Sequence, residues 1–320
     1  MHRICQYFLL SSLVWSIADN LVSAAETHPL TIEEINQTWN QRRERLQAME
    51  LKLSADVTSN KLSFMKSTFD DEDVLLTEAE TLRYMKEKIT YRMQYALLLD
   101  LPRFRCRLWG RRPLPQLKQM YNHDHTRVTD GKTAVSSFLF EGTSHITILN
   151  DPKSLTISRI TNLAPLRWSL LAGDPIAGTT LTSFTPRSQT EQIQGIDCTV
   201  LEKSDSRGLK RLWVAPRDHE CVVMKYVQQR SGKTVVAYQF QYDHNANFGR
   251  IPQSWDIKCF YQNHPHFRYG CKITVDSFNS KATIPSEEFE FALPLGARVT
   301  DLRLRDPKGG EFSFVVQPDQ

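Results

Sequence analysis

Apolar and polar residues alternate along most of this chain, which is the pattern of half-buried β-strands. The strongest example runs from Ile89 to Leu101, where every second residue is apolar. In its first half the polar residues Thr90, Arg92 and Gln94 stand between the apolar ones. Neighbouring side chains of a strand point to opposite faces of a sheet, so this stretch predicts a long strand that ends before Pro102. The same pattern, with shorter runs, predicts further strands at 62–65, 104–108, 119–129, 133–140, 146–149 and 155–160.

The rest of the chain is organised around residues 195–242, which alternate in the same way. Short runs rich in β-branched and aromatic residues are separated there by Gly, Pro, Ser and Asp, which predicts three or four consecutive antiparallel strands. In the last run Val236, Tyr238, Phe240 and Tyr242 occupy alternate positions and therefore share one face. The predicted sheet has a large aromatic face that another part of the chain must cover.

Two segments have the spacing of helices rather than strands. Thr31 and Glu34 match a capping box, and apolar residues then recur every three or four positions, which predicts a helix over 32–53. The apolar, non-alternating segment 163–171 predicts a short central helix. These elements predict a mostly β, α+β fold: a curved antiparallel sheet, or unclosed half-barrel, wrapped around the N-terminal helix and the short central one.

The N-terminal residues have the character of a secretory signal. A basic start, an apolar run over 4–17 and the small residues Val22-Ser23-Ala24 predict a signal peptide at 1–24, with a retained N-terminal anchor as the alternative. We expect 25–320 to form a single domain, with 300–320 as a candidate small appendage. The protein would then be periplasmic or secreted, without a transmembrane span after cleavage of the signal.

The overall composition is ordinary for a soluble globular protein. Hydrophobic residues make up 40%, charged residues 24%, and the net charge is +4. This weak positive charge, without a recognisable motif, gives no reason to expect a nucleic-acid partner.

Five cysteines follow the predicted signal segment. Cys259 and Cys271 flank 263–267 almost symmetrically, so a hairpin would place them opposite one another as a candidate disulfide. Cys198 and Cys221 would lie two strands apart in the predicted sheet, which favours buried thiols over a bond.

Known catalytic motifs are missing from the sequence. It has no G-x-S-x-G nucleophile elbow, no phosphate-binding G-x-x-x-x-G-K-[ST] loop and no H-E-x-x-H zinc helix. Two H-x-H pairs, His123/His125 and His264/His266, could bind a metal, but both are predicted in loops without a third ligand nearby. We therefore expect no catalysis, cofactor or metal; an exported hydrolase with a non-standard site is a minor alternative.

Three short motifs stand out along the chain: Asp130-Gly131, Leu212-Trp213-Val214-Ala215-Pro216, and the segment from Phe289 to Val299. The order of elements is a signal segment, an amphipathic helix and a long series of antiparallel strands with one helical interruption. In this order and in these motifs the chain resembles the superfamily of periplasmic lipoprotein carriers, LolA and LolB, with LppX and the sensor RseB. It is most similar to the large exported members from planctomycete-type bacteria.

This resemblance implies an unclosed barrel around an apolar cavity that binds a lipid or a lipidated protein without catalysis. An envelope interaction or sensor module of the RseB type, which binds a protein partner, is the alternative. For any single cavity residue, a packed core is the competing interpretation. The residues expected to line the cavity are Trp39, Leu46, Tyr95, Leu166, Trp168, Trp213, Tyr238 and Phe240.

Overall fold

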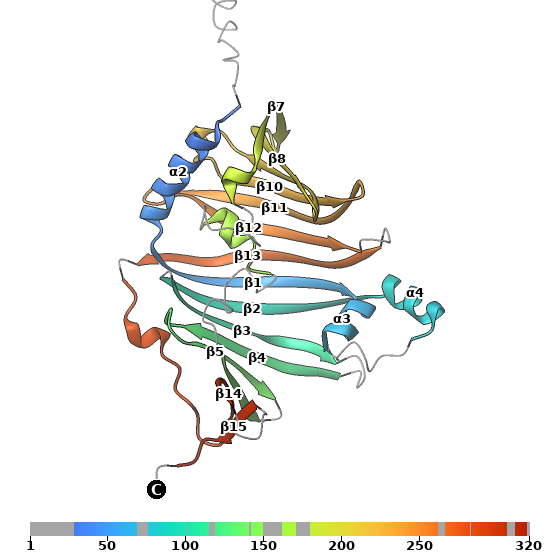
Figure 1. Cartoon of the computed structure of the whole chain (residues 1–320), viewed down its shortest axis with the longest axis vertical. Helices are drawn as coiled ribbons and strands as arrows, with labels where there is room; N and C mark the ends of the chain where they lie inside the picture. The colour runs from blue at the N-terminus through green and yellow to red at the C-terminus, as the bar shows by residue number, and fades with distance from the viewer. Residues whose placement is uncertain are drawn as a thin grey trace, which may run out of the picture.

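The strands of this chain form one 15-stranded sheet, shown in Figure 1. It is seen in a computed structural model that describes residues 29–68, 76–100, 102–114, 119–140, 142–149, 162–170, 180–261, 266–281, 283–305 and 311–318. The sheet is open, with β15 (Glu311–Val315) at one edge and β7 (Thr185–Ile193) at the other. The prediction of a mostly β fold built on one large unclosed sheet is confirmed.

Two antiparallel meanders make up most of the sheet, and β1 joins β13 at its centre. The first meander consists of β1 (Ala48–Asn60), β2 (Lys88–Asp100), β3 (Arg103–Leu114), β4 (Gln119–Thr129), β5 (Ala134–Phe140) and β6 (Thr143–Leu149). The second consists of β7, β8 (Ile196–Asp205), β9 (Gly208–Val214), β10 (Val223–Arg230), β11 (Lys233–Asn245), β12 (Gly249–Phe260) and β13 (Phe267–Lys281).

The last two strands depart from a purely antiparallel sheet. After β13, in the middle of the sheet, the chain crosses the first meander, and β14 (Arg298–Arg305) pairs with β6 in parallel. β15 then pairs with β14 in the antiparallel sense. The 300–320 segment therefore extends the main sheet in the residues that are described.

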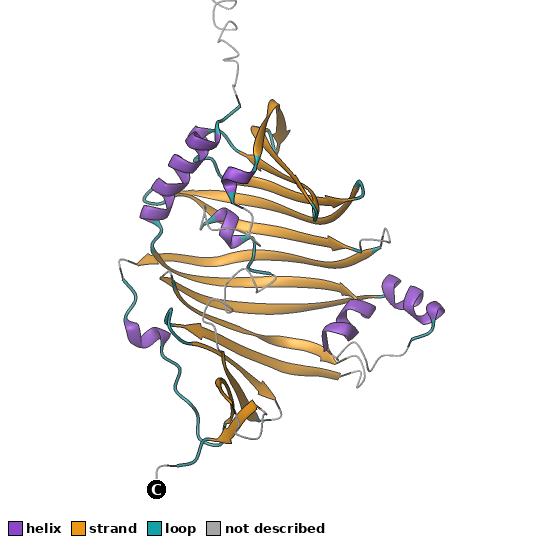
Figure 2. Cartoon of the chain, in the orientation of Figure 1, coloured by secondary structure: helices purple, strands orange, loops and turns teal. Residues whose placement is uncertain are grey.

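Helices lie against one face of the sheet and at the ends of its strands, as Figure 2 shows. α2 (Ile32–Arg45) and α5 (Leu166–Ser169) lie against the second meander, whereas α3 (Lys61–Thr68) and α4 (Glu78–Lys86) lie at the ends of β1 and β2. Three short 3-10 helices complete the described elements: η5 (Leu181–Ser183), η6 (Arg217–His219) and η7 (Ser286–Phe289). None of the described helices is long and apolar enough to cross a membrane.

The N-terminal helix is shorter than its sequence pattern predicts. Its capping box forms, with the Glu34 backbone N–H donating to Thr31 Oγ1 over 3.2 Å, but the helix ends at Arg45 and 48–53 belong to β1. The residues from Met49 to Val57 are apolar at every second position, and this strand pattern overlaps the helical spacing of Leu46, Met49 and Leu53. Pairing with both β2 and β13 selects the strand.

Several other predicted elements can be compared with the structure. The strands predicted at 119–129, 133–140 and within 195–242 are confirmed, and the central helix forms at Leu166–Ser169. The strand predicted at 62–65 is wrong, because α3 covers these residues. The strand predicted at 155–160 lies outside the described residues.

The main hydrophobic core lies on the sheet face that α2 and α5 cover, which we call the inner face. It includes the alternate residues Tyr95, Leu97 and Leu99 of β2 and Phe240 of β11. Smaller clusters lie on the opposite, outer face. One of them contains Cys198, Val200, Trp213 and Met224, and another contains Ala48, Val128, Ile284 and Phe289.

Candidate ligand pocket

The inner face has two regions with different packing. In the first, the covered region, the side chains of α2 and α5 fill the space above the second meander. Trp39 is completely buried and donates its indole N–H to the Cys221 carbonyl over 2.7 Å. Its ring lies 6.1 Å from that of Trp168, which in turn stacks on Tyr226 at 6.2 Å. The aromatic face of the second meander is therefore occupied by the protein itself.

A buried arginine fastens this cover to the sheet. Arg42 donates to the carbonyls of Ser169 in α5 and Arg250 in β12 over 3.0 and 2.7 Å. Its Nε lies 3.5 Å from the Glu220 carboxylate, which also pairs with Arg45 at 2.8 Å. Burial lowers the pKa of Arg42, and the carboxylate of Glu220 opposes that effect. One buried charge thus links helix, central segment and sheet.

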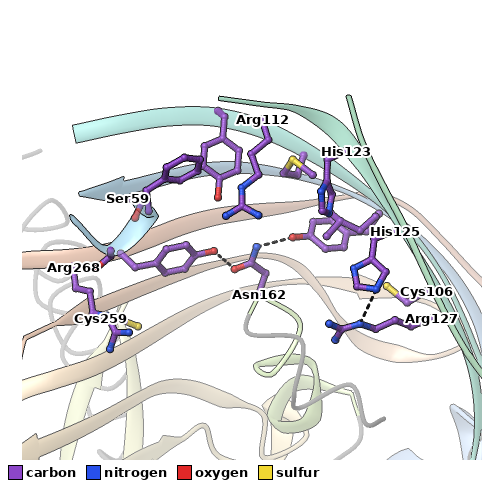
Figure 3. Close-up of a pocket in the computed structure, with 16 residues that line it drawn as sticks. Ser59, Cys106, Arg112, His123, His125, Arg127, Asn162, Cys259 and Arg268 are labelled. Carbon is purple, nitrogen blue, oxygen red and sulfur yellow. Dashed lines mark hydrogen bonds between the residues drawn. The ribbon is translucent and has the colours of Figure 1, made fainter. Parts of the chain in front are cut away.

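The second region, the open region, contains a cavity of about 540 Å³ beside the first meander, shown in Figure 3. Its walls come from β1 to β4, the ends of β12 and β13, α3 and the central segment. The sixteen lining residues are Ser59, Ser63, Phe64, Tyr91, Met93, Tyr95, Cys106, Leu108, Arg112, His123, His125, Arg127, Asn162, Cys259, Arg268 and Tyr269.

The strands of this region pack closely side by side, but their inner face has less cover than that of the second meander. Gly110 of β3 lies against β2, where an added Cβ would be only 2.7 Å from the Arg92 carbonyl oxygen and 3.0 Å from the Met93 sulfur, so this close approach requires glycine. Among the described elements, no helix lies over the middle of β2 to β5, whereas α2 and α5 cover the second meander. Where no described helix packs on the middle of these strands, their inner face remains a concave, largely apolar surface, which is the usual form of a ligand site.

Asn162 marks the boundary between the two regions. Its amide nitrogen donates to the Tyr95 hydroxyl over 2.6 Å, and its amide oxygen accepts from the Tyr269 hydroxyl. The Asn162 carbonyl accepts from the Trp255 indole over 3.0 Å. Burial raises the pKa values of Tyr95 and Tyr269, so both phenols stay protonated at neutral pH. These bonds give the inner end of the pocket a fixed, uncharged polar centre.

The charged residues of the pocket are all basic. Arg112, Arg127 and Arg268 line it together with His123 and His125, and no Asp or Glu is among the sixteen lining residues. Burial first, and then the Arg127 charge, lowers the pKa of His125 to about 4. Burial and Arg112 also lower the pKa of His123. Both imidazoles are therefore neutral at pH 7.

The two histidines were expected in a loop, and that expectation is wrong. Both lie in β4 and share its inner face, with ring centroids 6.0 Å apart. Between them Asp124 points to the outer face and pairs with Arg107 at 2.6 Å. Among the described residues no group of three metal-ligating side chains is found. Of the second predicted pair, His264 lies outside the described residues.

One contact resembles part of a catalytic dyad. Nε2 of His125 lies 2.8 Å from the Ser136 hydroxyl, and the same nitrogen accepts from Arg127 Nε over 3.5 Å. A general base works best with a pKa near the ambient pH, whereas the pKa of His125 is about 4. No carboxylate among the pocket-lining residues orients this imidazole. The geometry therefore favours a structural hydrogen bond over activation of Ser136.

Most of the cavity residues expected from the sequence lie in the covered region. Of the eight, Tyr95 alone lines the pocket. Trp213 lies in the outer-face cluster, where its indole donates to Glu191 over 2.9 Å, because its neighbours Leu212 and Val214 point inward. The remaining residues belong to the core packed around α2 and α5 or contact it: Trp39, Leu46, Leu166, Trp168, Tyr238 and Phe240.

The predicted Cys259–Cys271 disulfide does not form, and both thiols are free. The hairpin register places Cys259 opposite Tyr269 and Cys271 opposite Ile257, which is two residues away from the register that would pair the cysteines. The two cysteines are therefore offset along the ladder instead of facing one another. Burial raises the pKa of Cys271 to about 12 and that of Cys259 to about 11, so both stay protonated.

Several pocket residues could not be identified from the sequence. Arg112 on β3 and Arg127 on β4 point inward, between residues that face outward. Which of the alternating residues face inward is known only once the pairing of the strands is known. Asn162 stands in an irregular segment without a motif. No family model matches the chain, and no curated protein sequence matches it either.

Proposed function

We propose that this protein binds a lipid, or the acyl chain of a lipidated protein, in the open region, and acts as a carrier-like binding protein outside the cytoplasm. The cavity of about 540 Å³ is the observation that carries the proposal. Its size lies within the range of about 300–1,000 Å³ that is common for small-molecule sites. The apolar and aromatic side chains of Phe64, Tyr91, Met93 and Leu108 suit a hydrocarbon chain.

A role without catalysis agrees with the chemistry of the cavity. His125 has a pKa too low for a general base at pH 7, and the lining residues include no carboxylate. The phenols of Tyr95 and Tyr269 are held protonated and bonded to Asn162. Such groups can orient a ligand without reacting with it.

Uptake of a fluorescent fatty acid by the purified protein tests the proposal. We expect saturable binding with one site per chain. Leu108→Trp places an indole in the cavity and should weaken binding about tenfold or more, since each methylene displaced from an apolar site is worth about 0.8 kcal/mol. Trp213→Phe changes an aromatic residue on the outer face and serves as the matched control, with unchanged binding.

The results separate the possible functions. Absence of uptake, together with absence of lipid in extracts of protein purified from its native compartment, would contradict the proposal. Binding that Leu108→Trp does not affect would place the acyl chain elsewhere. Stable capture of one protein partner by delipidated protein would favour the interaction module instead. The edge strand β15, where Phe314 and Val315 are exposed, offers a surface for such pairing.

A further inference from the structure

Every charged side chain among the described residues that line the open region is basic. Three guanidinium groups, those of Arg112, Arg127 and Arg268, line the cavity, while its lining residues contribute no negative charge. With both histidines neutral, the lining carries positive charge alone at pH 7. A pocket for a purely hydrocarbon ligand gains nothing from this arrangement, because bringing charges out of water costs free energy.

Arg127 is the clearest case. It projects from β4 into the cavity, where its Nε donates to the neutral His125 ring over 3.5 Å. Burial lowers the pKa of Arg127, which is the sign of an incompletely compensated charge. Among the described residues no carboxylate forms an ion pair with it. Asp124 lies on the outer face with Arg107, and Asp130 accepts from the backbone N–H groups of its own turn.

Arg112 extends the same wall from the neighbouring strand. Its guanidinium lies 4.9 Å from the centre of the Phe64 ring and 5.9 Å from that of Tyr91. In Figure 3 it points into the cavity above Asn162, while Arg127 lies on the other side of Asn162 next to His125. An apolar ring beside a guanidinium is a surface that suits the junction between an acyl chain and its head.

We infer that the ligand of this pocket carries an anionic group, a carboxylate or a phosphate, that pairs with Arg127. The inference rests on the proposed function in that it specifies the head of the acyl ligand. Arg–carboxylate and Arg–phosphate pairs are short and often bidentate, and an anionic head would supply the negative charge that the described lining residues do not. The same chemistry could be met by a lipid head or by free phosphate, and the experiment separates these sources.

Competition against the bound fluorescent fatty acid measures the head preference on the native chain. Four competitors are compared: oleate, oleoyl lysophosphatidic acid, oleyl alcohol and inorganic phosphate. We expect the two anionic lipids to bind roughly tenfold to a hundredfold more tightly than the alcohol, the range for a hydrogen bond to a charged group. Arg127→Gln should abolish that preference, because it weakens the binding of the two anionic lipids.

Arg111→Gln is the matched control, because Arg111 is an exposed neighbour of Arg112 that points to the outer face. It should keep the full preference for anionic heads. Equal affinity of the native chain for oleate and oleyl alcohol would overturn the inference while leaving the proposed acyl binding intact. This comparison requires no variant. A preference that persists in Arg127→Gln would also overturn it.

Two further outcomes concern the free anion. Phosphate bound in an Arg127-dependent manner, without any acyl uptake, would support the anion site and contradict the proposed lipid function. Failure of all four competitors and of the probe to bind would overturn both.

Discussion

The two regions of the inner face are built on one continuous sheet, yet one is packed and the other is hollow. Both present aromatic and aliphatic side chains at every second strand position. In the covered region Trp39 and Trp168 enter the concavity from α2 and α5. In the open region the inward positions of β4 carry His123, His125 and Arg127 instead of apolar residues, and they line a cavity of about 540 Å³. The comparison shows that strand alternation defines a face, while the covering segments decide whether that face becomes core or site.

The largest effect is expected in the covered region. Trp39→Ala removes the side chain that joins α2 to the sheet and leaves a cavity, so the free energy of unfolding should fall by about 4 kcal/mol. Leu108→Ala, beside an existing cavity, should cost about 1 kcal/mol. Urea denaturation of both variants measures the difference. Similar losses would contradict the distinction between the two regions.

Asn162 connects the regions, and its replacement by Ala should cost about 2–3 kcal/mol. The variant leaves the hydroxyls of Tyr95 and Tyr269 without their amide partner, and each lost hydrogen bond is worth roughly 1 kcal/mol or more. Tyr95→Phe removes one of these bonds and should cost about half as much. Denaturation curves for the two variants test this ratio. A neutral Asn162→Ala would show that the boundary bonds do not matter for stability.

The open region should also make stability depend on pH. The folded-state pKa of His125 is about 4, below its ordinary value of 6.5, so the unfolded chain binds a proton first as the pH falls. The free energy of unfolding should therefore decrease between pH 6.5 and about 4, by on the order of 2 kcal/mol, and level off below. His125→Gln should lack this component. An identical pH profile for the variant would exclude His125 as its source.

The smallest effect on stability is expected where space is already present. Leu108→Trp should change the free energy of unfolding by less than about 1 kcal/mol, whereas Leu166→Trp should cost about 1–3 kcal/mol through overpacking in the covered region. Thermal unfolding of both variants makes the comparison. A larger penalty for Leu108→Trp would indicate that its surroundings are filled.

Much of the fold could be predicted because strand alternation is a local signal. The meander over 195–242 and the strands at 88–100 and 119–129 follow from it directly. The helix over 32–53 was extended too far because residues 46–53 satisfy both helical and strand periods, and pairing with β2 and β13 decides between them. Parallel addition of β14 to β6 depends on a long crossing that no local pattern encodes.

Most of the residues that line the pocket could not be predicted from the sequence. Tyr95 was identified because it stands on the inward side of an evident strand. Arg127 and His125 alternate correctly on β4, but a basic residue on a strand is usually solvent-facing, so charge argued against an inward position. Trp213 was expected on the wrong face, because aromatic character alone does not tell to which face of the sheet a residue points. The site depends on the strand register and on where the described helices pack, and both are properties of the assembled sheet.

The crystal structure of the protein with a fatty acid brominated in mid-chain would test the central distinction most directly. Anomalous scattering locates bromine independently of the surrounding model. We expect one bromine position in the open region near Leu108, with the carboxylate directed toward Arg127 and no position beside Trp39. Bromine between α2 and the sheet, or no ordered bromine at saturating fatty acid, would contradict a packed covered region beside a hollow, ligand-binding one.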